Sequence, residues 1–314
     1  NALINAARNG KKVIVALELK ARFDEANNLK WSKKLQEEGI RVLFGVDGLK
    51  VHSKLIVIER EENDVVKLYA HIGTGNFHEG NANIYTDHSL LTAHQSIAGE
   101  VRDVFRFLEM NYLHLKYNHL LVSPYTTRST FKRLIKKEIA NAKAGKKAYI
   151  YMKLNNLVDH DMIDLLYQAS QAGVVIKAVV RGICAMIPGM EGVSENITVQ
   201  SIIDRFLEHT RSFIFCNDGD ELYYISSADW MSRNLDNRVE VSVPIYDKNI
   251  QKTLKNYMEI SFSDNIKSRT IDRHQLNLYT SNSKKHKLRS QYESYKFFKK
   301  MLEGSKQNKI YDKL

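Results

Sequence analysis

The chain has few cysteines and no long apolar segment, and each of these shortages excludes a class of protein. Its two cysteines, Cys184 and Cys216, cannot form the disulfide framework of a small secreted protein and instead fit a reducing cytoplasm. No apolar run approaches the roughly 20 residues that a membrane-spanning helix requires, and no signal peptide opens the chain. At 314 residues, the chain is long enough for two domains with cores of their own.

Only three prolines interrupt the chain, and one of them gives the best candidate for a domain boundary. Pro124 lies between two stretches of similar pattern, so we predict a first domain over residues 1–123 and a second over residues 124–314. The chain begins with Asn1 rather than methionine, and the apolar residues soon after it predict a strand almost at once. We interpret such a start as typical of a fragment of a longer protein.

Acidic residues are scarce relative to basic ones. The 47 Lys and Arg residues face 36 Asp and Glu, which gives a formal net charge of +11. Residues 262–314 hold 13 basic and 5 acidic residues, so +8 of this excess lies in the C-terminal tail. A basic tail can dock a polyanion, but a solvated surface helix explains it equally well. Charge alone leaves nucleic acid, anionic lipid and polyphosphate open as partners.

The two halves of the chain repeat one order of features. Gly10-Lys11-Lys12 precedes an apolar run, and Gly145-Lys146-Lys147 precedes another one 135 positions later. Gly39 and Gly173, 134 positions apart, each precede a short run rich in β-branched residues. Agreement in the order of several separate features predicts a duplicated unit.

Each half is predicted to alternate strands with helices. In the first half, the pattern predicts a strand over residues 13–17, a helix over residues 24–38 that Gly39 ends, and a short strand over residues 42–44. In the second half, a helix that Thr126 or Thr127 caps ends at Gly145 and carries the apolar stripe Phe131, Leu134, Ile135 and Ile139. Such alternation predicts an α/β fold in which helices cover a mostly parallel or mixed sheet.

A histidine motif occurs once in each half. His52-Ser53-Lys54 has a degenerate counterpart in His209-Thr210-Arg211, 157 positions later, so the second half holds roughly 20 extra residues before its histidine. Each motif precedes an apolar run and then a turn of small residues that ends in Asn76 or Asp229. Two related histidines on two related halves predict one active site at a pseudo-twofold interface.

The chemistry of the motif suits phosphoryl transfer. On a strand, residues two positions apart share a face, so Lys54 is predicted to neutralise a phosphate oxygen while His52 attacks phosphorus. Histidine fits this task because its neutral ring is nucleophilic near pH 7 and its protonated form is a good acid. The pattern is similar to that of the phospholipase D superfamily, His-x-Lys-x4-Asp followed by Gly-Ser-x-Asn. It departs from that pattern at Glu59 and Cys216, which take the two Asp positions.

Longer strings around the motifs resemble the long-type polyphosphate kinase family. They cover nearly the whole chain in the family's order, so the chain is similar to the C-terminal two domains of that enzyme, without its N-terminal and head domains. The resemblance implies two tandem phospholipase D-like domains related by a pseudo-twofold. In the first half the strings are Lys20-Ala21-Arg22-Phe23-Asp24-Glu25, Gly48-Leu49-Lys50-Val51-His52-Ser53-Lys54, Gly73-Thr74-Gly75-Asn76-Phe77-His78-Glu79 and Tyr85-Thr86-Asp87. In the second half they include Val180-Arg181-Gly182-Ile183-Cys184, Arg205-Phe206-Leu207-Glu208-His209 and Tyr224-Ile225-Ser226-Ser227-Ala228-Asp229-Trp230-Met231.

This resemblance implies reversible transfer of the γ-phosphate of ATP to the end of an inorganic polyphosphate chain. His52 matches the histidine that the family phosphorylates. His209 matches a second active-site histidine, which protonates or steadies the transferred group. Arg22 and Arg181 match arginines that bind phosphates, a task suited to a permanently charged guanidinium fork.

Further site residues and the metal follow from the same resemblance. Tyr85 matches a nucleotide-binding position, and Asp87 is expected to orient the histidine network. Lys54, the two arginines and a magnesium ion would supply the charge that phosphoryl transfer requires. The family is magnesium-dependent, and Arg22 matches a position of its metal–phosphate site, where we expect the arginine to hold the phosphate that carries the metal. No Asp/Glu cluster in the sequence has a clear magnesium-ligand pattern.

The implied partners are ATP or ADP and inorganic polyphosphate. The full-length family forms homo-oligomers, and a cytoplasmic location is expected. No nucleic acid is expected as a partner, and the basic tail is compatible with peripheral membrane association.

Two other functions stay open from the sequence. A phosphodiesterase or nuclease of the phospholipase D type would use the same phosphohistidine chemistry and would bind nucleic acid through the basic surface. The departures at Glu59 and Cys216, together with the string Tyr85-Thr86-Asp87, argue against it. The other alternative is a non-catalytic fragment that binds polyanions, because part of the family's nucleotide pocket comes from its N-terminal domain.

Overall fold

A computed structural model describes residues 1–18, 25–113, 115–280 and 287–311. The chain forms two compact units, each built from several segments. The first unit holds residues 1–73, 89–128 and 232–243, and the second holds residues 74–88, 129–231 and 244–314. The predicted boundary at Pro124 lies close to the change of unit after residue 128. Each unit, however, also takes one segment from the far side of that boundary, residues 232–243 and 74–88 respectively.

The first unit begins with a small α/β layer. Its elements are α1 (Ala2–Arg8), β1 (Ile14–Ala16), α2 (Glu25–Glu37) and β2 (Arg41–Leu43). β1 and β2 pair in parallel, and Ile4, Leu35 and Ile40 form the core between helices and strands. The predicted strand, helix and second strand are confirmed. The prediction that the chain enters a strand almost at once is wrong, because α1 precedes β1 and buries Ile4.

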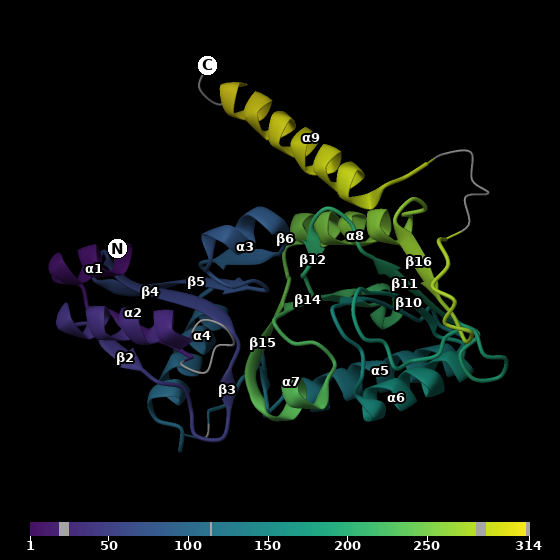
Figure 1. The fold of residues 1–314 in the computed structure, drawn as a ribbon, viewed down its shortest axis with the longest axis horizontal. Coiled ribbons are helices and arrows are strands. Elements are labelled where there is room, and N and C mark those ends of the chain that lie inside the picture. Colours follow the sequence, from purple (N-terminus) through teal and green to yellow (C-terminus); the bar gives the residue numbers. More distant parts are fainter. Residues whose placement is uncertain (19–24, 114, 281–286, 312–314) are drawn as a thin grey trace. The chain divides into compact units, whose positions relative to one another are not determined.

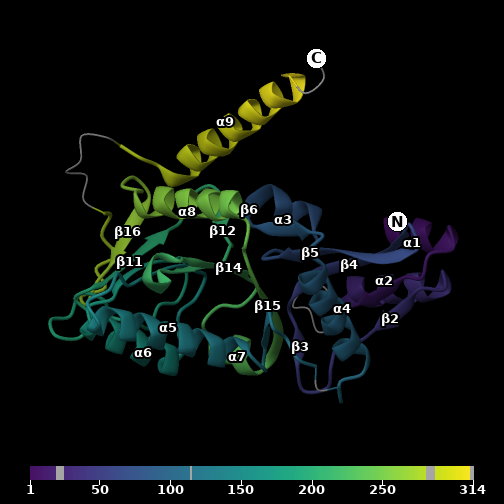
Figure 2. The ribbon, with the colours of Figure 1, turned by 180° about the vertical axis from the view of Figure 1, so that it is seen from behind.

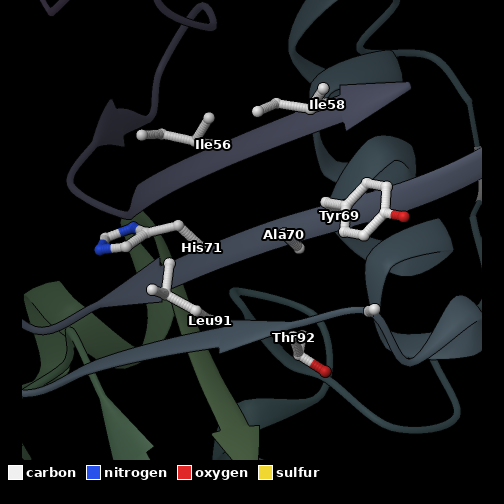
Figure 3. A pocket seen from close by; sticks show the side chains of 8 residues that line it. Ile56, Ile58, Tyr69, Ala70, His71, Leu91 and Thr92 are labelled. Carbon is white, nitrogen blue, oxygen red and sulfur yellow. The ribbon is translucent and has the colours of Figure 1, made fainter. Parts of the chain in front are cut away.

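An antiparallel sheet of β4 (Lys54–Glu62), β5 (Val65–Gly73) and β7 (Ser89–Thr92) follows. Helix α4 (Gln95–Glu109) covers the face that carries Leu68. On the other face, Ile56, Ile58 and Leu91 are exposed, and with Tyr69 and His71 they line a shallow, mainly apolar hollow of about 460 Å³ (Figure 3). None of the predicted site residues lines this hollow.

The segment 232–243 brings a helix and a strand into the first unit. α7 (Ser232–Asp236) leads into β15 (Arg238–Pro244). β15 pairs antiparallel with β8 (Leu121–Ser123) and parallel with β3 (Lys50–Val51), so that Val239 lies opposite Val51. The strand that ends just before His52 is therefore held by a strand from the far end of the sequence.

The second unit is built on a mixed sheet in the order β16-β11-β10-β9-β13-β14. β9 (Tyr149–Leu154), β10 (Val175–Val180) and β11 (Ile197–Ile202) are parallel. β13 (Ser212–Phe215), β14 (Leu222–Ser226) and β16 (Ser268–Ile271) are antiparallel to their neighbours. Helices α5 (Thr127–Lys143) and α6 (His160–Gln171) lie on one face of the sheet and α8 (Lys248–Phe262) on the other (Figures 1 and 2).

The apolar patterns of the second unit produce this layered packing. Phe131, Leu134 and Ile135 of the predicted stripe are buried on α5, and Phe131 packs against Phe213 and Trp230 of the core. Between β10 and His209, the second half holds a loop and β11, which account for the extra residues of the repeat. The sheet is mixed, as the alternation of strands and helices predicts.

Short elements complete the second unit. α3 (Glu79–Ile84) runs into β6 (Tyr85–Thr86), which pairs in parallel with β12 (Leu207–Glu208). The long helix α9 (Ser290–Tyr311) lies next to α8, on the side away from the sheet (Figure 1). Among the described residues, no helix is both long and apolar enough to cross a membrane.

Candidate active site

The first histidine lies in a break between two strands, not within one. β3 ends at Val51 and β4 begins at Lys54, so the prediction that His52 and Lys54 share one strand face is wrong. The physical reason is that the backbone N–H groups of His52 and Ser53 both donate to the carbonyl oxygen of Val239, at 3.0 Å each. The chain therefore turns out of regular pairing at the histidine. Lys54 is 5% exposed and donates its Nζ to the carbonyl oxygen of His52.

A buried carboxylate, Glu240 of β15, holds the ring of His52. Its two oxygens lie 2.9 and 3.0 Å from Nδ1, and Nδ2 of Asn234 donates to Oε1 at 2.6 Å. Glu240 is fully buried, and a carboxylate can only accept hydrogen bonds. Nδ1 of His52 therefore carries the proton, and in the neutral ring the lone pair resides on Nε2.

The second histidine lies in a matching break between β12 and β13. Nδ1 of His209 is 2.8 Å from Oδ1 of Asp87, so a carboxylate fixes the proton on Nδ1 here as well. Arg211, two residues later, donates to the carbonyl oxygen of His209 at 2.7 Å, as Lys54 does for His52. The same Nη1 of Arg211 lies 3.2 Å from Nε2 of His209. Both motifs thus place a cation on the histidine's own carbonyl and a carboxylate on its Nδ1.

The carboxylate of Asp87 is held in place from several sides. Its Oδ1 also accepts a 2.6 Å hydrogen bond from the hydroxyl of Thr74. A Cβ on Gly75 would lie 2.1 Å from Oδ2, so only glycine fits beside this carboxylate. Burial alone would raise the pKa of Asp87, but the hydrogen bond and charge of His209, the bond from Thr74 and the charge of Arg211 lower it overall. Asp87 is consequently ionised at neutral pH.

A second buried carboxylate, Asp229, anchors Arg211 from behind. Asp229 follows β14 and accepts hydrogen bonds from Nε and Nη2 of Arg211 at 3.2 and 3.4 Å. It also accepts from the backbone N–H of Asn155 at 2.8 Å, just after β9. Burial alone would raise the pKa of Asp229, but the charge and hydrogen bond of Arg211 lower it overall. Asp229 therefore fixes the position of Arg211 and of the loop after β9.

Arg181 follows β10, at the carboxyl edge of the parallel strands, which is where α/β folds place ligands. Its Nε donates to Oδ1 of Asn155 at 2.7 Å, so this anchor is a neutral amide. Burial and the nearby charge of Arg211 lower the pKa of Arg181, whereas Asp229 acts in the opposite direction. A guanidinium anchored through an amide keeps its charge available for an anion, which suits the predicted phosphate contact.

The predicted site residues fall into two groups. In the second unit, Tyr85, Asp87 and His209 are adjacent, with the rings of Tyr85 and His209 5.1 Å apart between centroids. Arg181 joins this group because Asn155 also donates to the carbonyl oxygen of His209, at 3.4 Å. In the first unit, His52 lies beside Lys54. Arg22 lies outside the described residues. That both groups form one active site stays a prediction.

Sequence reasoning missed Glu240, although the repeat could have found it. The turns that begin at Gly73 and Ser226 are 153 positions apart, and the same offset applied to Asp87 gives Glu240. The two carboxylates are also exchanged between halves: Asp87 from the first half pairs with the second histidine, and Glu240 from the second half pairs with the first. This exchange explains why each unit takes a segment from the far side of Pro124.

No group of three or more His, Cys, Asp or Glu in the described part of the chain is arranged to hold a metal ion. Asp87, Asp229 and Glu240 are each engaged by histidine, arginine or amide partners. These carboxylates do not fit a magnesium cage built by the protein alone, because Mg²⁺ requires oxygen ligands in near-octahedral order.

Comparison with known proteins shows the family of the chain. A sequence model of the polyphosphate kinase C-terminal domain 1 matches residues 1–114, and one of the C-terminal domain 2 matches residues 120–291. The chain belongs to the polyphosphate kinase family. The two tandem matches confirm the predicted order of two domains in an α/β fold.

Members of this family resemble the chain closely. A polyphosphate kinase of Vibrio parahaemolyticus is 52% identical over 309 residues, which are 98% of this chain and 44% of that protein. The crystal structure of polyphosphate kinase from Porphyromonas gingivalis has a TM-score of 0.89 and 41% identity, over 96% of this chain and 46% of that one. The chain thus spans less than half the length of these two polyphosphate kinases. A phosphatidylserine synthase of Haemophilus influenzae, with a TM-score of 0.52 and 10% identity, shares the fold alone.

Proposed function

We propose that this chain carries the phosphotransfer centre of a polyphosphate kinase, which moves the γ-phosphate of ATP reversibly to the end of inorganic polyphosphate. The observation that carries the proposal is the matched pair of histidines, each with a carboxylate on Nδ1. A carboxylate in that position directs the ring's lone pair to Nε2 and stabilises the positive charge that the ring gains when Nε2 bonds to phosphorus.

His52 is the proposed nucleophile. Its Nε2 forms the bond to the γ-phosphorus, the bond from that phosphorus to the β,γ-bridging oxygen breaks, and ADP leaves. A terminal oxygen of polyphosphate then attacks the phosphorus, the N–P bond breaks, and the neutral imidazole of His52 returns. Glu240 holds Nδ1–H throughout and offsets the charge of the phosphorylated ring.

His209 is proposed to steady or protonate the transferred group. Arg211 lies against Nε2 of His209, and a cation that shares this lone pair makes the ring a weaker nucleophile. The same arginine and Arg181 supply the positive charge that the equatorial oxygens of a transferring phosphoryl group require. Tyr85, beside His209, is proposed to pack on the nucleotide base.

Magnesium is proposed to arrive bound to ATP, as part of the substrate. Among the described side chains, the carboxylates near the histidines are engaged with protein partners, which supports a metal held mainly by phosphate oxygens and water. Arg22 is proposed to hold the phosphates that carry it, and Lys54 to add positive charge near His52. ATP as substrate and two free cysteines favour the cytoplasm as the location.

Labelling with γ-³²P ATP tests this function and its nucleophile. The sequence is placed in a polyphosphate kinase of the relatives' full length, and the phosphoenzyme is trapped with and without polyphosphate. The expected label is acid-labile, is discharged by ADP or polyphosphate, and maps to His52. It disappears in His52→Gln and persists in His160→Gln, which changes an exposed histidine on α6.

The alternatives predict other results. A phosphodiesterase would not take up the γ-phosphate, and a polyanion-binding fragment would bind polyphosphate without any label. Normal label in the His52→Gln variant would refute the assignment of the nucleophile.

A further inference from the structure

The segment that enters His209 is held on one side by the start of α9. Every second residue of this segment, at positions 204, 206 and 208, contacts Arg289 or Gln291. Arg289 forms two hydrogen bonds to the carboxylate of Asp204, at 2.5 and 2.7 Å. Gln291 bonds Phe206 in both directions: its Nε2 donates to the carbonyl oxygen at 2.9 Å, and the backbone N–H donates to Oε1 at 3.0 Å. The backbone N–H fixes the orientation of the amide, because it requires an oxygen opposite.

The same amide reaches the residue before His209. Nε2 of Gln291 donates to Oε1 of Glu208 at 2.6 Å. Glu208 is 5% exposed, and its other oxygen accepts from Nζ of Lys153 at 2.5 Å and from the hydroxyl of Thr86 at 3.3 Å. Burial alone would raise the pKa of Glu208, but the charge and hydrogen bond of Lys153, with the bonds from Gln291 and Tyr257, lower it overall. An ionised carboxylate thus ties α9, β9 and β6 to β12.

The register of β12 against β6 brings Asp87 to His209. β12 and β6 are only two residues long each, so few backbone hydrogen bonds fix their pairing. Glu208 lies opposite Thr86, and the residues that directly follow these two are His209 and Asp87. A shift of the short strand would separate Nδ1 of His209 from the carboxylate of Asp87, which are 2.8 Å apart.

We propose that Gln291 is a positioning residue for His209: its carboxamide clamps Phe206 and Glu208 so that β12 stays in register with β6 and His209 stays bonded to Asp87. The functional part of this inference rests on the role proposed for His209 above. Gln291 is partly exposed and carries no charge, so its replacement leaves no buried charge unpaired: Glu208 keeps its partner Lys153. Removal of Lys153 or Glu208, by contrast, would leave an unpaired buried charge and would destabilise the whole unit.

The test combines two variants with a matched control in the full-length enzyme and in the 314-residue chain. Gln291→Ala removes all three hydrogen bonds. Gln291→Glu keeps an acceptor for the N–H of Phe206 but places a second carboxylate beside Glu208. The control, Gln171→Ala, removes a glutamine that donates from the end of α6 to the carbonyl oxygen of Gly192. Imidazole nitrogens are followed by ¹⁵N NMR, with His209 assigned by the loss of its signals in His209→Gln.

The expected result is that His209 shows an Nδ1–H bonded to carboxylate in the native chain and in Gln171→Ala. This signature weakens in Gln291→Ala and weakens further in Gln291→Glu, with phosphotransfer falling about tenfold or more in the same order. A His209 spectrum that does not change in either Gln291 variant, whatever the loss in thermal stability, would overturn the positioning role. Normal phosphotransfer in His209→Gln would instead refute the catalytic role of His209, and the spectra would still decide whether Gln291 positions it.

Discussion

The pairing of Glu240 with His52 leads to the sharpest prediction. Replacing one carboxylate oxygen of Glu240 by an NH₂ group separates the catalytic role of this residue from its structural role. Glu240→Gln keeps the shape of a fully buried side chain and removes its charge. The new amide can still offer its oxygen to Nδ1 of His52. Asn234 can turn its own amide to accept from the new NH₂ group, because its Oδ1 has no hydrogen-bond partner among the described residues. Glu240 also lies 3.9 Å from Nη1 of Arg238, so the exchange weakens bonds to a charged group. We therefore expect a loss of stability of about 1.5–3 kcal/mol.

The effect on the reaction should be larger. When Nε2 bonds to phosphorus, the ring of His52 becomes positively charged at roughly 4 Å from the carboxylate charge. At an effective dielectric constant of about 20, this pair contributes about 4 kcal/mol. Because each 1.36 kcal/mol of barrier is a factor of ten in rate, Glu240→Gln should slow the phosphorylation of His52 by about 10² to 10³-fold.

Rapid-quench labelling of the full-length enzyme with γ-³²P ATP, together with urea unfolding, measures both effects. Glu100→Gln is the matched control, since Glu100 is also buried in the first unit but accepts from the backbone N–H groups of Asn118, His119 and Leu120. Its replacement turns an NH₂ group toward these donors and should cost roughly 2–3 kcal/mol of stability without slowing the chemical step. Phosphorylation of Glu240→Gln at the native rate would refute the charge argument.

Two further predictions concern the second unit. Arg181→Ala should weaken the binding of polyphosphate and of an unhydrolysable ATP analogue by about ten- to a hundredfold, as expected for a charged hydrogen bond worth roughly 1.5–3 kcal/mol. Arg181→Lys should recover only part of this affinity, because the fork of donors is lost. Unchanged affinity in calorimetric titration would show that Arg181 has a structural role. Burial, with the charge of Lys153, lowers the pKa of His88 from 6.5 to about 4. As the pH falls, His88 therefore becomes protonated in the unfolded chain before it does so in the folded chain. The free energy of unfolding should consequently fall between pH 6.5 and pH 4 more steeply in the native chain than in His88→Gln. Equal slopes in urea unfolding would contradict the buried neutral ring.

Local patterns in the sequence specify the elements and the chemistry of the site. The apolar stripe of α5, the glycine that ends α2 and the short apolar strands follow from periodicity and from backbone freedom, which depend only on near neighbours. The two histidine motifs are visible for the same reason, since each is a contiguous string. Spacing alone, however, placed His52 and Lys54 on one strand. The carbonyl of Val239, far away in sequence, breaks the strand at that point.

Only the tertiary structure decided which carboxylate serves which histidine. Glu240 and His52 are 188 positions apart, and Asp87 and His209 are 122 positions apart. Their contacts arise from the pairing of β15 with β3 and of β6 with β12, strands that carry no local signal of their partner. Side-chain propensities determine whether a segment extends or coils, but partner choice depends on the burial and hydrogen bonding of the whole unit. For that reason the sequence shows both histidines, whereas the exchange of carboxylates between the halves appears only once the chain is folded.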